Sequence, residues 1–284
     1  MSYRIAPAAA GTSPAHPAGE RRRSALFAAS ADAYDRFMGR YTPDLARGLA
    51  DVAEIKPGLR VLDIGCGPGG LTGVLADRVG ATNVAAIDPA PQFAAACRRR
   101  HPGVDVRVGV AEFLPWPDEY FDGVLSSLVI GFVDDPALAV REMRRVTRPG
   151  GVVAACMWDL AEGGMTMLRT FWGAMGTVMP GANEGGRQGR ARGEIAELLR
   201  AAGLEVVFDS ELRSHADYTD FDDFWDPFTG GVGPAGQALA SLSAAQRAAV
   251  REACRTLLPS GSFTLTARAW CAAGRVPLDA GPGD

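Results

Sequence analysis

The sequence lacks several features that define common classes of protein. Its five cysteines are widely spaced and form no C-x-x-C pair, which argues against a zinc site and against a disulfide framework. No apolar run approaches the length of a membrane-spanning helix, and no apolar segment follows the positive residues near the N-terminus, as one would in a secretory signal. We therefore expect a cytoplasmic protein with reduced thiols, no bound metal and no membrane partner.

A strong charge is also missing. The formal net charge is −4, so the composition predicts no basic surface for nucleic acid. The two arginine clusters are short. Arg21–Arg23 lies in a segment rich in Ala, Pro and Gly, and Arg98–Arg100 suits the C-terminus of a helix, where cations interact favourably with the helix dipole. We expect no nucleic-acid partner.

The chain does contain a regular alternation of apolar runs and helical patterns. With 284 residues and 47% hydrophobic composition it can bury a full core. Such alternation predicts parallel strands, right-handed crossovers and helices on both faces. The expected fold is α/β: a Rossmann-like, doubly wound, seven-stranded and mostly parallel sheet with helical cap insertions. Strands are expected at 60–64, 84–88, 104–108, 122–127, 151–158, 204–209 with a continuation towards 218, and 262–271, and helices at 70–79, 91–100, 136–147 and 194–202.

Composition and turn signals divide the chain into a core and additions. A Lys-Pro-Gly turn precedes the first strand, and glycine- and proline-rich stretches separate the later segments. The expected parts are a disordered tail at 1–24, a helical cap at 25–56, a cofactor-binding core at 57–158, a helical insertion and loop at 159–203, the final strands at 204–275 with a helical cap insertion at 219–258, and a tail at 276–284.

The most informative segment is the glycine-rich turn after the first strand. Residues 61–70 read VLDIGCGPGG: an apolar run containing Asp63, then Gly65, Gly67 and Gly69, and then a helical pattern. Glycines allow the backbone to approach a ligand closely, and a helix N-terminus offers free N–H groups. Asp88 ends the next apolar run, where nucleotide-binding units place the carboxylate that binds ribose. The segment predicts a site for a nucleoside-containing cofactor.

The glycine pattern alone does not identify the cofactor, because G-x-G-x-x-G also fits NAD. Three further features favour another nucleoside. Asp63 suits a ligand with an ammonium group, which a dinucleotide does not require. The block Ala111–Trp116 precedes a fourth strand that begins at Phe121, and Arg148–Gly151 turns the chain into the fifth strand.

Four ordered blocks resemble the class I S-adenosylmethionine-dependent methyltransferases: the glycine-rich turn, Asp88, the segment from Ala111 to the fourth strand, and Arg148–Gly151. The resemblance covers residues 59–157 and is greatest to type 11 methyltransferases and the branch related to quinone-biosynthesis C-methyltransferases. It implies that S-adenosylmethionine is the cofactor. One position departs from the pattern, since many relatives have an aspartate where this chain has Val110.

The resemblance also implies how the cofactor is bound. The glycines would pack on its methionine and ribose parts, Asp63 would lie near its amino group, and Asp88 would bind the ribose hydroxyls. Tyr34 and Arg40 could close over the cofactor, with Arg40 on its carboxylate, although a surface role for Arg40 is an equal alternative. The full set of expected cofactor contacts is Tyr34, Arg40, Asp63, Gly65, Cys66, Gly67, Gly69, Asp88, Pro89, Ala111, Glu112, Phe113, Ser127 and Leu128.

Aromatic side chains in the additions predict an apolar or planar acceptor. The acceptor pocket is expected where the strand C-termini meet the insertions. The same aromatics at helical spacing are also typical of a core. Candidate walls are Phe37, Tyr41, Ile130, Phe132, Trp158, Phe171, Trp172, Trp225 and Phe228. No general base is evident; His215 and Tyr41 are candidates, with a structural role as the alternative for His215.

The predicted function is methyl transfer from S-adenosylmethionine to a small apolar or aromatic molecule, by a monomer or homodimer. Two alternatives stay open. One is an NAD-dependent oxidoreductase. The other is a non-catalytic module that binds S-adenosylmethionine or S-adenosylhomocysteine, which the missing aspartate at Val110 and the absence of an evident base would suit.

Overall fold

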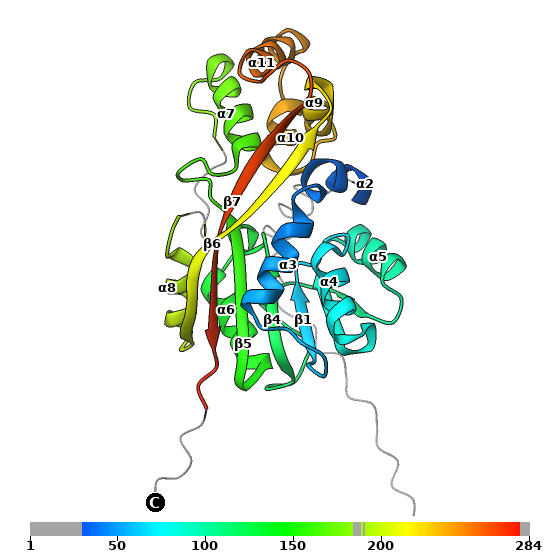
Figure 1. The fold of residues 1–284 in the computed structure, drawn as a ribbon, viewed down its shortest axis with the longest axis vertical. Coiled ribbons are helices and arrows are strands. Elements are labelled where there is room, and N and C mark those ends of the chain that lie inside the picture. Colours follow the sequence, from blue (N-terminus) through cyan, green and yellow to red (C-terminus); the bar gives the residue numbers. More distant parts are fainter. Residues whose placement is uncertain (1–29, 184–188, 190, 279–284) are drawn as a thin grey trace, which may run out of the picture.

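The computed structural model describes residues 30–183, 189 and 191–278. The expected tail at 1–24 lies outside the described residues, as do parts of the glycine- and arginine-rich loop at 185–193 and of the tail at 276–284. In the described part, a seven-stranded sheet has the order β3-β2-β1-β4-β5-β7-β6 (Figure 1). The prediction of an α/β, doubly wound sheet is confirmed.

Five neighbouring strands are parallel. They are β1 (Val61–Ile64), β2 (Val84–Asp88), β3 (Asp105–Val108), β4 (Phe121–Ser127) and β5 (Thr147–Trp158). The last strand in sequence, β7 (Phe263–Arg275), runs antiparallel between β5 and β6 (Glu205–Tyr218). This order differs from the 3-2-1-4-5-6 order of the dinucleotide-binding fold.

Helices cover both faces of the sheet, so its central strands are buried on both sides. Every residue of β1 and β2 is buried. On β5, the alternate residues Val152, Ala154, Cys156 and Trp158 join one hydrophobic cluster, and the residues between them join another. One face carries α3 (Thr42–Val52) and α4 (Gly70–Val79), the other α6 (Pro136–Val146) and α8 (Glu194–Ala201), and α5 (Pro91–Arg100) packs beside β2 and β3.

The strands β6 and β7 extend beyond the sheet as a long two-stranded ribbon. The last β5–β7 pair is Trp158 with Ala269, whereas β6–β7 pairing continues to Tyr218 with Phe263. The helices that gather at the end of the ribbon form the cap (Figure 1). They are α7 (Thr166–Val178), α9 (Phe221–Thr229), α10 (Gly233–Ala240) and α11 (Ala244–Thr256).

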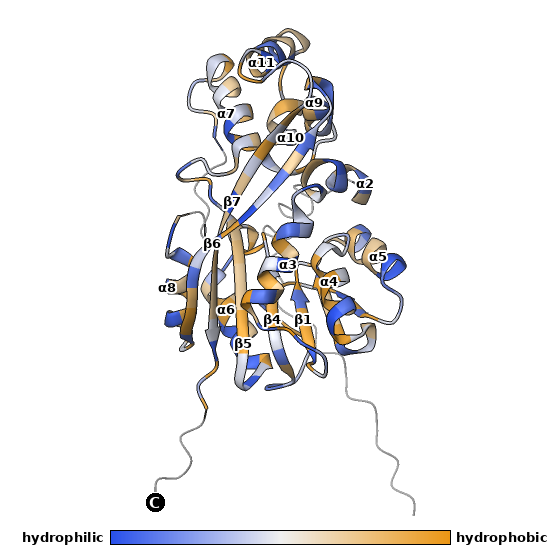
Figure 2. Ribbon diagram, viewed as in Figure 1, coloured by the Kyte–Doolittle hydropathy of each residue, from blue (hydrophilic) through white to orange (hydrophobic). Residues whose placement is uncertain are grey.

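Short helical segments complete the described chain. The N-terminal ones, α2 (Ala31–Tyr34) and the π-helical η1 (Asp35–Gly39), lie between the cap and α5, and η2 (Ala81–Asn83) precedes β2. The 3-10 helix η3 (Ile130–Phe132) follows β4. Hydrophobic residues predominate in β1, β4 and β5, and hydrophilic residues mark the outer sides of α5 and α11 (Figure 2).

Candidate active site

A cleft opens at the carboxyl ends of β1, β2 and β4, where parallel α/β sheets bind their ligands. It is lined by backbone of the glycine-rich turn, by the end of β2 and by the segment after β4. The lining residues are Tyr34, Ile64, Gly65, Gly67, Ile87, Asp88, Pro89, Ala90, Phe93, Gly109, Val110, Ala111, Ser127, Leu128, Val129, Phe132 and Val133. Apart from Tyr34, Asp88 and Ser127, these side chains are apolar or absent, which suits a flat nucleobase.

The glycine-rich turn uses left-handed backbone at Gly65 (φ 67°), Gly67 (φ 53°) and Gly69 (φ 107°). A Cβ atom at Gly65 would collide with Val129. At Gly67 a Cβ atom would meet nothing within 4 Å, so this side of the turn faces open space in the cleft. The turn therefore exposes its backbone to a ligand at Gly67 and is packed elsewhere.

Asp88 connects the end of β2 to the glycine-rich turn. One of its carboxylate oxygens accepts a hydrogen bond of 2.8 Å from the Gly67 N–H, and the other accepts one of 2.8 Å from the Ala90 N–H. Burial raises the pKa of Asp88 to about 6, although both N–H groups lower it. The carboxylate thus fixes the turn and also lines the cleft, where its remaining lone pairs can accept ribose hydroxyls.

Asp63 lies deeper, beside a smaller cavity that adjoins the glycine-rich turn. Its carboxylate is 1% exposed and accepts a hydrogen bond of 2.6 Å from the Thr72 hydroxyl. Burial raises the pKa of Asp63 to about 7; the Thr72 hydroxyl lowers it, and the negative charge of Asp88 raises it further. A ligand ammonium group in this cavity, which Tyr34 and Cys66 also line, would stabilise the ionised carboxylate.

The segment after β4 brings the cleft and its neighbouring cavities together at Leu128. This residue has a left-handed backbone (φ 64°), rare for a side chain with a Cβ atom, and its N–H donates to the Cys156 carbonyl at 2.9 Å. Leu128 and Tyr34 each line the cleft, the small cavity and a third cavity beneath the cap. Strained backbone of this kind is typical of functional sites.

Most of the expected cofactor contacts line the cleft or the small cavity. These are Tyr34, Asp63, Gly65, Cys66, Gly67, Asp88, Pro89, Ala111, Ser127 and Leu128. Gly69 does not, because it packs against the ring of His101. The Glu112 carboxylate instead accepts a hydrogen bond of 2.8 Å from the Asp134 N–H, and Phe113 is 55% exposed. Phe93 and Val129 are lining residues that sequence reasoning missed, although Val129 directly follows Leu128 and Phe93 lies in the predicted helix at 91–100.

The prediction that Arg40 binds the cofactor carboxylate requires a correction, because Arg40 forms its contacts with the cap and the ribbon. Its guanidinium forms an ion pair of 2.8 Å with Asp223, donates to the Asp217 carbonyl and lies over the ring of Tyr218 at 4.4 Å. It lines neither the cleft nor the small cavity. A cofactor carboxylate at Arg40 would have to displace this ion pair.

The prediction of Tyr41 and His215 as candidate general bases also requires a correction. Tyr41 is fully buried, its hydroxyl is 2.9 Å from the Tyr218 hydroxyl, and burial raises its pKa far above the ordinary value, so it can reach no acceptor. His215 lies in a different groove, on the outside of the β6–β7 ribbon, with Nδ1 3.4 Å from the Asp44 carboxylate and a side chain 63% exposed. Neither residue lies in the cleft.

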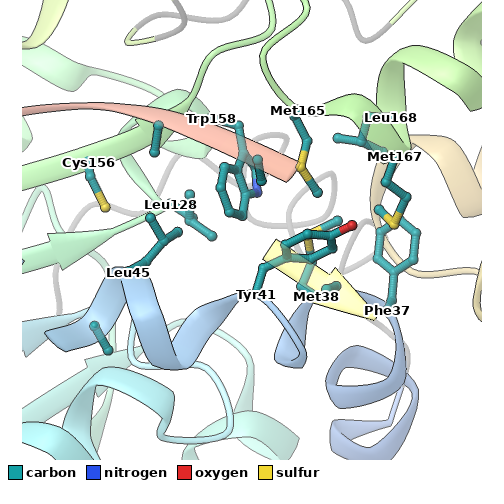
Figure 3. Close-up of a cluster of buried hydrophobic side chains, with 14 of the residues drawn as sticks. Phe37, Met38, Tyr41, Leu45, Leu128, Cys156, Trp158, Met165, Met167 and Leu168 are labelled. Carbon is teal, nitrogen blue, oxygen red and sulfur yellow. The ribbon is translucent and has the colours of Figure 1, made fainter. Parts of the chain in front are cut away.

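The third cavity forms an apolar chamber between the carboxyl end of the sheet and the cap. Phe37, Phe132 and Trp158 line it, as sequence reasoning expected. Figure 3 shows Phe37, Met38, Trp158 and Leu168 around this part of the core. The complete lining is Tyr34, Phe37, Met38, Leu128, Phe132, Met157, Trp158, Leu160, Leu168, Val232, Gly233, Pro234 and Ala235.

The other expected acceptor walls belong to the hydrophobic core. Phe171 and Phe228 stack on each other at 4.4 Å, and Trp225 stacks on Phe221. Trp172 packs edge-on against Phe171, and Ile130 is buried on the opposite face of the sheet. For these residues the core interpretation is the one that the structure supports. Chamber residues such as those at 232–235 were missed because a short Gly-Pro-Ala segment gives no sequence signal for a pocket.

Comparison with known proteins identifies the class of this site. Residues 62–155 match a family described as a methyltransferase domain. A malonyl-acyl-carrier-protein O-methyltransferase of Serratia marcescens is 33% identical over 150 residues, which are 51% of this chain and 57% of that protein. An uncharacterized methyltransferase of Mycobacterium bovis is 37% identical over 131 residues, which are 46% of this chain and 51% of that protein. The chain thus spans about half the length of the curated relatives it matches.

Solved structures share the fold. A SAM-dependent methyltransferase of Thermotoga maritima aligns with a TM-score of 0.52 and 21% identity, covering 90% of this chain and 99% of that chain. A 4+2 cyclase named SpnF aligns with a TM-score of 0.55 and 22% identity, covering 82% and 81%. At these identities the likeness concerns the fold alone.

The sheet order, the glycine-rich turn with its two carboxylates and the matched family define the core as a class I S-adenosylmethionine-dependent methyltransferase domain. S-adenosylmethionine is the cofactor of this class. The NAD interpretation of the glycine pattern is therefore wrong. No helix in the described part of the chain is long and apolar enough to cross a membrane.

Proposed function

We propose that the protein transfers the methyl group of S-adenosylmethionine to a small apolar acceptor bound in the chamber. One observation carries this proposal: Tyr34, Leu128 and Phe132 line both the cofactor cleft and the chamber. The two spaces have these lining residues in common and so adjoin, and an acceptor in the chamber would lie beside a ligand in the cleft. That neighbourhood is what direct methyl transfer requires.

The residues of the cleft and of the small cavity beside it fit the chemical groups of this cofactor. Asp88 can accept the ribose hydroxyls, and the buried carboxylate of Asp63 can pair with the amino group. The apolar walls at Phe93, Val110 and Ala111 suit the adenine ring. When bound, the cofactor supplies a methyl group that its sulfonium already makes electrophilic. The chain's own task is then to hold the acceptor in line and exclude water, and such positioning can lower a barrier by roughly 7–11 kcal/mol.

The chamber contributes no evident general base. Among the described residues that line it, Tyr34 is the only one with a titratable side chain, and burial raises the pKa of Tyr34 well above its ordinary value, so the phenol stays protonated. The acceptor must therefore carry an atom that is nucleophilic without help from a lining carboxylate or imidazole. A neutral apolar molecule also fits a wall of methionine, leucine and aromatic side chains, which would disfavour a charged one.

The same observation leaves a second candidate function: a module that binds the cofactor and does not transfer its methyl group. The described residues that line the chamber include no carboxylate or imidazole, which favours it. The structural neighbour that is named a cyclase also shows that this fold can accompany another reaction. Sheet and cap would enclose the ligand in the same way in both cases.

Transfer of label distinguishes the two candidates. The protein is incubated with methyl-labelled S-adenosylmethionine and a small-molecule extract of bacterial cells, and the organic fraction is counted. An Asp63→Asn variant serves as the control, because it should weaken cofactor binding. Label in an organic product, lost in the control, supports methyl transfer. Label only in protein or RNA, or binding of S-adenosylhomocysteine without any transfer, contradicts it.

A further inference from the structure

The indole of Trp158 carries a polar group that has no partner. Trp158 is the last residue of β5 and is 4% exposed. Within the described part of the chain its Nε1–H, fully buried, has no hydrogen-bond acceptor. Buried tryptophan N–H groups usually have a partner, so an unpaired one at a ligand cavity needs an explanation.

The indole is packed within the main hydrophobic cluster. The Tyr41 ring stands edge-to-face with it at 5.9 Å, and Cys156 precedes it on the same face of β5. In Figure 3 the indole lies between Leu128 and Met165, with its nitrogen on the edge turned away from Leu128. Among the described residues that line the chamber, the Tyr34 phenol and this N–H are the only side-chain polar groups.

The chamber can adapt to a molecule that reaches this N–H. Met38 and Met157 line it, and Met165 lies nearby in the same buried cluster as Trp158. Unbranched methionine side chains rearrange readily around a ligand. Trp158 is also close to the lining that the chamber shares with the cleft, because the residue two positions earlier on β5, Cys156, holds the backbone of Leu128 with a hydrogen bond of 2.9 Å.

We propose that the Trp158 N–H is a specificity-determining donor, which selects acceptors that combine an apolar body with a hydrogen-bond-accepting oxygen such as a carbonyl. This inference rests on the proposed function, since it concerns the same chamber. A hydrocarbon of equal shape would leave the N–H unpaired, whereas a carbonyl oxygen would satisfy it.

Two probes of nearly equal shape test the proposal: 1-indanone, which has a carbonyl group, and indane, which has a CH₂ group in its place. Their affinities for the full chain saturated with S-adenosylhomocysteine are measured by ligand-observed NMR. The indole N–H resonances of ¹⁵N-labelled protein are followed in parallel, and that of Trp158 is assigned by its loss in Trp158→Phe. Trp270→Phe is the matched control, because the Trp270 Nε1–H is also buried without a partner but Trp270 does not line the chamber.

We expect 1-indanone to bind about tenfold more tightly than indane and to shift the Trp158 N–H resonance downfield. That preference should fall to less than about twofold in Trp158→Phe and persist in Trp270→Phe. Equal affinity for the two probes, a preference that survives in Trp158→Phe, or binding of neither probe would overturn the proposal. Transfer of the labelled methyl group is measured separately, as described above, so a failure of the methyltransferase proposal is distinguishable from a failure of this one.

Discussion

At the scale of single residues, two buried carboxylates dominate the cofactor site. Asp63 and Asp88 lie at the ends of adjacent parallel strands, and burial raises the pKa of each, to about 7 and about 6. Unlike most surface carboxylates, they therefore change charge near neutral pH. The ionised form is the one that pairs with an ammonium group or accepts ribose hydroxyls, so binding of the cofactor is coupled to their ionisation.

This coupling predicts a pH dependence of cofactor affinity. S-adenosylhomocysteine should bind about tenfold more tightly at pH 8 than at pH 6, because a carboxyl with a pKa of about 7 is mostly protonated at the lower pH. Calorimetry across this range measures the effect. Asp63→Asn should bind weakly with a flatter profile, and a wild-type affinity that does not change with pH would contradict the role of Asp63.

Stability of the ligand-free protein should change in the opposite direction. Because the pKa of Asp63 in the folded protein is raised above its unfolded value, the folded state binds more protons between these values. The free energy of unfolding should therefore be highest near pH 4, as far as this group contributes, and should fall as the pH rises to about 7. Urea unfolding of wild type and Asp63→Asn across this range measures the difference; an identical pH slope in both would exclude the effect.

The open side of Gly67 predicts a selective loss of binding. Gly67→Val places a side chain in the cleft and costs about 1–2 kcal/mol for a left-handed residue with a Cβ atom. We expect affinity for S-adenosylhomocysteine to fall by roughly a hundredfold or more while circular dichroism shows a folded protein. Gly58→Val is the matched control, since Gly58 also has a positive φ (92°) and open space but precedes β1. Unchanged affinity in Gly67→Val would refute the site.

At the scale of elements, a pair of tyrosines connects the start of α3 to the ribbon. The hydroxyls of Tyr41 and Tyr218 are 2.9 Å apart and buried, 177 residues apart in sequence. Beside them, Arg40 joins Asp223 at the start of α9. These contacts hold the N-terminal segment against the cap.

Removal of either hydroxyl would leave the other buried without this partner. Tyr41→Phe and Tyr218→Phe should each lower the free energy of unfolding by about 1–3 kcal/mol. The double variant should cost less than the sum, with a coupling of about 0.5–3 kcal/mol. Urea unfolding of the four proteins measures this. Strictly additive effects would show that the hydroxyl pair contributes no coupling energy.

Sequence reasoning located the core elements well, because their signals are local. The predicted helices at 70–79 and 91–100 coincide with α4 and α5. The final strand was placed short, ending at 271 where β7 ends at Arg275. Pairing between β5, β7 and β6 determines that end, and such pairing is not a property of one segment.

The cofactor site was also predictable where its sequence signals are local. Asp63 and Asp88 lie at or next to the end of apolar runs that identify strands, and Gly67 lies in the turn after the first of them. Arg40 was misplaced because its partner Asp223 lies 183 residues away in sequence. The aromatic residues of the cap could not be sorted into wall and core, since both environments are apolar and only the packing of α7 against α9 to α11 decides between them.

At the scale of the whole molecule, the sheet supplies the cofactor site and the ribbon carries a cap over an adjoining chamber. Ligand binding to such a site should stabilise the fold. S-adenosylhomocysteine at a hundred times its Kd should raise the free energy of unfolding by about 2.7 kcal/mol, or several degrees in Tm. NAD at the same concentration should give no shift. A shift with NAD instead would contradict the assignment of the cofactor.

The relation between cleft and chamber is tested most directly by a crystal structure with S-adenosylhomocysteine. We predict the ribose at Asp88, the amino group at Asp63 and the sulfur beside Tyr34 and Leu128, facing the chamber that Trp158 lines. A cofactor whose sulfur faces bulk solvent, or a chamber separated from the sulfur by side chains, would contradict methyl transfer to an acceptor beneath the cap.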